Sequence, residues 1–242
     1  EGWSLDQARA KCLEVDRTRE LFTRYFFGNA AAQPAQFDLV VNTSRVSLEE
    51  VTCVVAAFVR PDSVEVVSGA ARDRVLTLSR ELGAGETQFA AALAERLKMQ
   101  VYDRELLEQE AVRLGVPEAE IEKIDERPAG IFQRFRPGSI YQRYIEALKQ
   151  NMEQLAERGD VILVGRAGNC ILRDDRRALH VRLIAPMPVR LRRVMEYRWV
   201  RERVAKKLID ESDDQRRSFY DSYFGVDWSN PLEYHITVNS GR

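Results

Sequence analysis

The stretch that most constrains the fold is 75–103, where a short apolar run, a glycine turn and an amphipathic helix follow one another. Val75–Leu78 is typical of a buried strand, and Gly83–Thr87 (GAGET) is typical of a turn. Apolar residues then recur at helical spacing, namely Phe89, Ala90, Leu93, Ala94 and Leu97. A strand that leads through glycines into a helix predicts an α/β protein.

The turn Gly83–Thr87 is a candidate phosphate loop. Glycines let backbone N–H groups approach phosphate oxygens, and a helix N-terminus adds partial positive charge. The turn departs from the pattern G-x-x-x-x-G-K-[ST], because Arg80 stands at the first glycine and Glu86 at the lysine, and only Thr87 fits. On this turn alone, a tight strand-to-helix connection that binds no phosphate is an equally good interpretation.

Composition excludes several classes of function. The 242 residues can form one sizeable core, or one domain plus a large fragment. Lys+Arg 37 against Asp+Glu 38 gives a net charge of −1, so we expect neither a nucleic-acid nor a membrane partner. No apolar run approaches the roughly 18 residues of a membrane helix.

The cysteines and histidines support neither a disulfide framework nor a zinc site. Cys12, Cys53 and Cys170 are widely separated, and His180 and His235 are the only histidines. This pattern indicates a reducing compartment, and we expect a cytoplasmic protein whose histidines are structural. The chain starts without Met inside a helical pattern, which we interpret as truncation or processing.

An internal repeat relates the two ends of the chain. A shift of 197 residues aligns 8–28 with 205–225 without a gap, and the match continues as far as Arg45 and Arg242. The identities include Asp16 with Asp213, Arg19 with Arg216, Phe22 with Phe219, Gly28 with Gly225 and Asn42 with Asn239. Two amphipathic helices can match by chance, but a gapless match through helix, loop and strand favours a true repeat.

The repeat predicts a division of the chain. Residues 1–60 are the C-terminal part of a first copy, 61–74 are a linker, and 75–242 are a second copy. The first copy continues into a helix near 47–58, opened by a Ser-x-x-Glu capping signal, which the second copy lacks. The strand at 37–42 has no sheet of its own in residues 1–60. We therefore expect residues 1–60 to dock within the chain, on a partner chain as a homodimer, or on missing sequence.

Strands and helices alternate in the second copy. Further strands are predicted at 100–103, 161–164, 179–185 and 234–239, and helices at 139–158, 191–208 and 210–223. With the strand at 75–78, these give a five-stranded parallel sheet with helices on both faces. In such a doubly wound α/β fold, the ligand binds at the carboxyl ends of the strands.

Arginines recur at those carboxyl ends, as Arg80, Arg104 and Arg166. After the fourth strand of the second copy come Arg190, Arg192, Arg193, Arg198 and Arg201, followed by Asp213, Asp214, Arg216 and Arg217 on the next helical segment. Guanidinium groups bind phosphate in bidentate fashion. For any single arginine, a solvated helix face is the commoner explanation, and Asp103 is equally well explained as a helix cap.

Four motifs in register resemble the cytidylate-kinase-like family of P-loop proteins. VLTLSRELGAGETQFAAALAERLKMQVYDRELL is similar to the strand, phosphate loop and F-Y-D-R-E of that family, and VILVGRAGNCIL to its V-I-V-G-R segment. APMPVRLRRVMEYR and DESDDQRRSFYDSYFG resemble its lid and late segments. The match covers 75–242 and, through the repeat, 1–60 as the lid helices, last strand and last helix of a first kinase-like copy. It implies a three-layer P-loop NTPase-like fold with a helical lid and acceptor region.

The resemblance also implies a reaction, phosphoryl transfer from ATP to a nucleoside monophosphate that is CMP-like. Binding of the ATP phosphates is implied for Arg80, Gly83, Ala84, Gly85, Glu86 and Thr87, with Thr87 reaching Mg²⁺. Acceptor binding is implied for Asp103, Arg104, Arg166, Asp213 and Arg216, and catalytic roles for Arg166, Arg190, Arg193 and Arg198.

Glu86 keeps other functions open. A carboxylate beside the β- and γ-phosphates adds repulsion where negative charge must be neutralised. This favours, as an alternative, a nucleotide-sensing or assembly module with weak or no turnover. A kinase for a related, non-nucleotide acceptor is a third interpretation, since no residue in the sequence fixes a cytosine ring.

Overall fold

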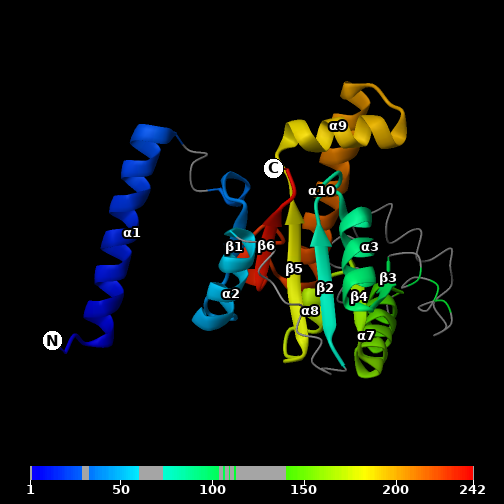
Figure 1. The fold of residues 1–242 in the computed structure, drawn as a ribbon, viewed down its shortest axis with the longest axis horizontal. Coiled ribbons are helices and arrows are strands. Elements are labelled where there is room, and N and C mark those ends of the chain that lie inside the picture. Colours follow the sequence, from blue (N-terminus) through cyan, green and yellow to red (C-terminus); the bar gives the residue numbers. More distant parts are fainter. Residues whose placement is uncertain are drawn as a thin grey trace.

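A single six-stranded sheet organises the protein, as the computed structural model shows (Figure 1). The structure describes residues 2–28, 33–59, 73–103 and 140–241, together with 106, 109 and 112. The strands are β1 (Leu39–Val41), β2 (Val75–Arg80), β3 (Gln100–Tyr102), β4 (Val161–Val164), β5 (Ala178–Ile184) and β6 (Ile236–Asn239). They lie side by side in the order β1-β6-β5-β2-β4-β3.

The five-stranded parallel sheet predicted for 75–242 is confirmed, because β2 to β6 all run parallel. The predicted number of strands in the whole sheet is wrong, because β1 adds a sixth strand. This strand runs antiparallel to β6, with Leu39 opposite Val238. Of the docking alternatives for 37–42, the structure thus shows the one within the chain. The homodimer and the domain limits stay predictions, and residues 61–72 of the linker lie outside the described residues.

The larger helices are α1 (Leu5–Phe27), α2 (Leu48–Val59), α3 (Glu86–Leu97), α7 (Ile140–Arg158), α9 (Met187–Arg198) and α10 (Glu202–Phe224). Shorter ones are α8 (Gly168–Ile171), η1 (Pro34–Gln36) and η3 (Pro231–Glu233). The predicted helix break at 209 is wrong. The chain turns at Trp199, which has a left-handed φ of 55°, whereas Ile209 is fully buried inside α10. Within the described residues, no helix is both long and apolar enough to cross a membrane.

Helices cover both faces of the sheet, which confirms the three-layer prediction. Leu76 and Leu78 of β2 pack with Ala90 of α3 on one face. Val75, which points the opposite way because side chains alternate along a strand, packs with Leu148 of α7 on the other. The carboxyl ends of β5 and β2 point toward α9, which crosses that end of the sheet (Figure 1). A ligand site at this edge therefore lies under α9.

The helix α1 contributes no residue to the core. It begins at a capping box formed by Ser4 and Gln7, and none of its residues is buried. In Figure 1 it stands apart from the sheet, whereas the strand β1 that follows it is part of the sheet.

Candidate functional site

The glycine turn lies between β2 and α3, under α9. Gly83 and Gly85 have φ angles of 83° and 86°, in the left-handed region that glycine adopts without strain. A Cβ atom on Gly83 would lie 2.8 Å from the carbonyl oxygen of Arg190 in α9. Gly85 is the N-cap of α3. The glycines are thus required both for the turn and for the close approach of α9.

Three consecutive carbonyl groups of the turn each accept a hydrogen bond from a side chain. The oxygen of Leu82 accepts from Arg190 Nε at 2.8 Å, that of Gly83 from Arg193 Nη1 at 3.4 Å, and that of Ala84 from Ser240 Oγ at 2.5 Å. The peptide bonds of the described residues are trans, so each N–H points opposite to the carbonyl it is bonded to. The N–H group of Gly83 therefore points away from Arg190 of α9, and that of Gly85 points away from Ser240, which follows β6. Together with the first N–H groups of α3, they form a set of donors suited to an anion.

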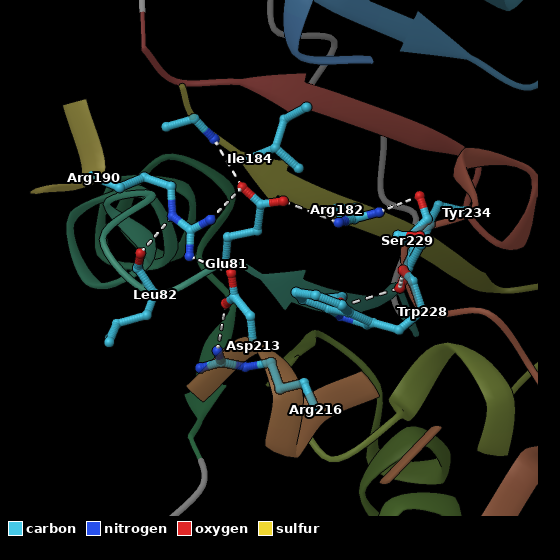
Figure 2. A network of polar contacts seen from close by, with 12 residues as sticks. Glu81, Leu82, Arg182, Ile184, Arg190, Asp213, Arg216, Trp228, Ser229 and Tyr234 are labelled. Carbon is cyan, nitrogen blue, oxygen red and sulfur yellow. Dashed lines mark hydrogen bonds and ion pairs between the residues drawn. The ribbon is translucent and has the colours of Figure 1, made fainter. Parts of the chain in front are cut away.

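A buried ion-pair network fixes α9 and α10 to the turn (Figure 2). Arg190 Nη2 lies 2.5 Å from Asp213 Oδ2 of α10, and Arg190 Nη1 lies 3.4 Å from Glu81 Oε2, directly after β2. Glu81 Oε1 also accepts from Arg182 of β5 at 3.1 Å. The side chains of Arg190 and Arg182 are only 6% and 4% exposed. Because uncompensated buried charges are costly, these groups have to remain paired.

The guanidinium group of Arg216, on α10, is affected by the charge of Arg80. Burial, followed by the positive charge of Arg80, lowers the pKa of Arg216 to about 10, against the opposing effect of Asp213 and Glu86. Arg216 Nη1 donates to Ser212 Oγ at 2.8 Å and lies 3.4 Å from Asp213 Oδ1. Like charges held in a protein interior make a favourable place for an anion.

Glu86 is the first residue of α3 and points to the same group of charges. Its Oε1 atom lies 3.9 Å from Arg80 Nε, and the two side chains are 20% and 17% exposed. A carboxylate at a helix N-terminus is electrostatically favourable. It therefore competes with a phosphate for the same donors and cations.

Arg166 lies at the adjacent end of β4. A Cβ atom on Gly165 would come 2.2 Å from Arg80 Nη1, so the Arg80 side chain lies directly on the backbone beside Arg166. The Cζ atom of Arg166 is 5.9 Å from the ring centroids of both Tyr144 and Phe219. The predicted residues Arg80 and Arg166 are thus brought to one edge of the sheet.

Other predicted residues are placed differently. Asp103 Oδ1 accepts from the Leu106 N–H at 3.2 Å, as a helix cap does. Thr87 is exposed on α3, and Arg198 is exposed at the end of α9 with its Cζ atom 5.8 Å from the Tyr197 ring centroid. Arg104 lies outside the described residues. Their roles toward a ligand stay predictions.

Magnesium binding by Thr87 also stays a prediction. Across the described parts of the chain, no three His, Cys, Asp or Glu residues are grouped so that they could hold a metal ion. A metal held jointly by a hydroxyl group and nucleotide phosphates needs no such group. The exposed Thr87 hydroxyl at the start of α3 fits that arrangement.

Sequence reasoning missed Glu81, Arg182 and Ser240. Ser240 follows β6 directly, so the carboxyl-end rule applied to the last strand would have found it. Glu81 follows β2 in the same way. Arg182 gives no such signal, because it lies within β5 and does not follow it. Its Cζ atom is 4.6 Å from the ring centroid of Trp228.

Comparisons with known proteins agree with this geometry. The model of the cytidylate kinase-like family matches residues 75–242. The chain is 26% identical over 177 residues to the cytidylate kinase of Methanopyrus kandleri. The aligned region covers 69% of this chain and 85% of that protein. The crystal structure of an uncharacterized protein from Eubacterium ventriosum superposes with a TM-score of 0.55 at 21% identity, over 69% of this chain and 88% of that one. This last likeness concerns the fold alone.

Proposed function

The chain belongs to the cytidylate kinase-like family, and we propose that it transfers a phosphoryl group from ATP to a nucleoside monophosphate, CMP or a close relative. The observation that carries the proposal is the orientation of the glycine turn. Its carbonyls accept from Arg190, Arg193 and Ser240, so the N–H groups of Gly83 and Gly85 point away from Arg190 and Ser240 respectively. A polyphosphate is the ligand that suits such donors at a helix N-terminus.

The cationic residues divide into those that bind phosphate and those that position the lid. Arg80 and Arg216 are proposed to neutralise charge on the transferring phosphate, because Arg80 ends β2 before the turn and Arg216 lies 3.4 Å from Asp213, the partner of Arg190. Arg190 and Arg193 hold α9 on the turn and act through it. Mg²⁺, when bound through Thr87, would supply further neutralisation of the phosphates.

The acceptor is proposed to bind at the ends of β3 and β4. The residues assigned there are Asp103, Arg104 and Arg166, with Asp213 and Arg216 reaching across from α10. Arg198 is assigned to closure of the lid over the bound nucleotides. The free cysteines Cys12, Cys53 and Cys170 support a reducing, cytoplasmic setting.

A second candidate, a nucleotide-binding module with weak or no turnover, is favoured by one observation. Glu86 Oε1 lies 3.9 Å from Arg80 Nε, so a carboxylate already forms an ion pair with an arginine that is proposed to bind phosphate. Repulsion between this carboxylate and the ATP phosphates would weaken the charge neutralisation on which phosphoryl transfer depends.

A coupled assay of ADP release across CMP, dCMP, UMP and AMP tests the proposal, with ATP binding measured by calorimetry on the same samples. We expect turnover with CMP or dCMP, reduced about 100-fold or more by Arg166→Ala, since positioning and charge stabilisation carry phosphoryl transfer. The matched control is Arg176→Ala, an exposed arginine before β5, which should leave the rate unchanged. ATP binding without formation of ADP in the presence of any of these acceptors would support the second candidate instead.

A further inference from the structure

The two copies of the repeat have the same helix and strand bounds, apart from one extra residue at the end of β6. A shift of 197 residues carries α1 onto α10 and η1 onto η3 with no change at either end, and β1 onto the first three residues of β6. The glycines that end the two helices make the same contact. The Gly28 N–H donates to Arg24 O at 3.1 Å, and the Gly225 N–H donates to Asp221 O at 3.0 Å.

The pairing of β1 with β6 is symmetric under the same shift. Val40 lies opposite Thr237, its own counterpart, while Leu39 lies opposite Val238 and Val41 opposite Ile236. The backbone bonds repeat this symmetry, since Asn42 N–H donates to His235 O and Asn239 N–H donates to Asp38 O, both at 2.9 Å. The two segments are therefore related by a local two-fold axis that passes between Val40 and Thr237, as in an isologous dimer interface.

The two segments differ in what lies on their other side. The far edge of β6 pairs in parallel with β5, and α10 packs on α9 through Ala205 and Ile209. The corresponding edge of β1 is the outer edge of the sheet, and α1 buries no residue. Strand edges and apolar helix faces of this kind are normally covered.

The exposed face of α1 carries the residues that α10 uses for its contacts. Asp213 of α10 pairs with Arg190, and Phe219 and Phe224 pack into buried clusters. Their counterparts in α1 are Asp16, Phe22 and Phe27, which are identical in type. Asp16 is exposed, and Phe22 and Phe27 are 58% and 70% exposed. The same is true of Arg19, the exposed counterpart of Arg216.

We propose that α1 and β1 form a docking surface for a second P-loop kinase-like core, of the kind formed here by β2 to β5, α3 and α9. The core would add a strand parallel to the outer edge of β1 and receive α1 where α10 lies in the present core. Asp16 and Arg19 would then enter the site of the docked core, with Asp16 pairing with its arginine at the position of Arg190. Two cores would share one continuous sheet about the local two-fold axis.

The identity of the occupant follows from these contacts. A second copy of this whole chain does not offer the required surface, because its own α10 and β6 already occupy those positions. An unrelated apolar partner would not require the retained acidic and basic pair Asp16 and Arg19. The proposal does not depend on turnover, since it concerns packing alone.

The test adds such a core to the protein in the register that the repeat defines. Residues 75–200 are fused in front of Ser4, which reproduces the junction between Val200 and Arg201. Hydrogen exchange is measured on peptides from α1 and β1 in the original chain and in the fusion. We expect exchange within α1 to slow by about tenfold or more, because its amides move from an exposed helix into a packed one.

The matched control is a fusion to Asp6, which shortens the junction by two residues and turns α1 by about 200° relative to the added core. Slow exchange in both fusions would indicate non-specific collapse and overturn the proposal. A folded in-register fusion whose α1 exchanges as fast as in the original chain would overturn it as well.

Aggregation of the fusion to Ser4 would also overturn the proposal, because a core in the correct register should cover α1 and β1. If sedimentation shows the original chain to be a dimer in which α1 is already protected, the occupant is a second copy and the proposal is wrong.

Discussion

Asn42 and Asn239 make the same side-chain hydrogen bond in opposite directions across the β1–β6 pair. Asn42 Nδ2 donates to Leu232 O, and Asn239 Nδ2 donates to Ala35 O, both at 2.9 Å. Each side-chain oxygen then accepts from the N–H two residues further on, at 3.1 Å from Ser44 and 3.0 Å from Gly241. Both asparagines are 7% exposed. The segment around β1 and the segment around β6 are thus joined by equivalent pairs of hydrogen bonds, one pair from each asparagine.

Asn42→Ala and Asn239→Ala are expected to destabilise the protein by similar amounts, about 1–3 kcal/mol each, since each leaves a carbonyl oxygen without its donor. Urea unfolding followed by circular dichroism measures the change. Thr43→Ala is the control, because Thr43 is exposed and the side-chain hydrogen bonds of Asn42 go to Leu232 and Ser44. A large loss for Asn239→Ala with none for Asn42→Ala would show that β1 unfolds separately from the sheet.

Glu86→Lys is expected to tighten ATP binding. The substitution removes a carboxylate that lies 3.9 Å from Arg80 and places a cation at the position that the strict phosphate-loop pattern gives to lysine. Partly buried charge interactions of about 1 kcal/mol correspond to a roughly fivefold gain in affinity, measured by calorimetry.

Glu95→Lys makes the same change of charge nine residues further along α3, at an exposed position. That is about 14 Å along the helix axis, beyond the screening length at physiological ionic strength, so ATP affinity should stay unchanged. Equal gains in the two variants would mean that only net charge matters and that Glu86 has no local effect on the turn.

His180 should make the protein sensitive to acid. Burial, followed by the charge of His235, lowers the pKa of His180 to about 3 from its usual 6.5. Between these values the unfolded chain binds a proton that the folded protein does not, so stability falls as pH decreases from 6.5 toward 3. Between about pH 6 and pH 3, this one group contributes a loss of about 1.4 kcal/mol per pH unit.

His180→Asn keeps a polar partner for Thr77 Oγ1, which lies 2.9 Å from His180 Nδ1. We expect the variant to be less stable at pH 7 but to lose less stability between pH 6.5 and 5 in urea unfolding series. His235→Gln should also flatten the slope, but by less, because it removes the charge of His235 and leaves burial, the larger cause of the lowered pKa of His180. An unchanged slope in His180→Asn would contradict the assignment.

The sequence predicted the parallel sheet and the glycine turn because both depend on local patterns. Runs such as Val161–Val164 identify buried strands, and the left-handed φ angles of Gly83 and Gly85 require residues of that type. The helix break at Trp199 was not predictable, because a left-handed φ at tryptophan is unusual and the apolar periodicity continues through Ile209.

The candidate site was predictable only in part. Arg190 and Arg193 were identified as cations, yet their partners Glu81 and Ser240 come from 109 residues earlier and 47 residues later in the chain. Pairings over such distances depend on how the strands are ordered in the sheet, which residue types alone do not give. The carboxyl-end rule indicates where such residues gather, but it does not indicate which of them contact one another.

Ser240→Ala is expected to weaken ATP binding more than it weakens the fold. The hydroxyl donates to Ala84 O at 2.5 Å and accepts from Arg193 Nη1 at 3.0 Å, so it links the last strand to the glycine turn and to α9. Its loss releases one of the three carbonyls that orient the turn. Two hydrogen bonds of about 1 kcal/mol each suggest a loss of affinity of roughly five- to thirtyfold.

The control is Ser229→Ala, whose hydroxyl donates only locally to Asp227 Oδ1 at 2.6 Å, while its carbonyl bond to Arg182 is kept. Calorimetry with ATP and thermal unfolding are measured for both variants. A Ser240→Thr variant, which keeps the hydroxyl, should restore most of the affinity. If Ser240→Ala lowers the melting temperature strongly but binds ATP as the original protein does, Ser240 stabilises the sheet and does not orient the turn.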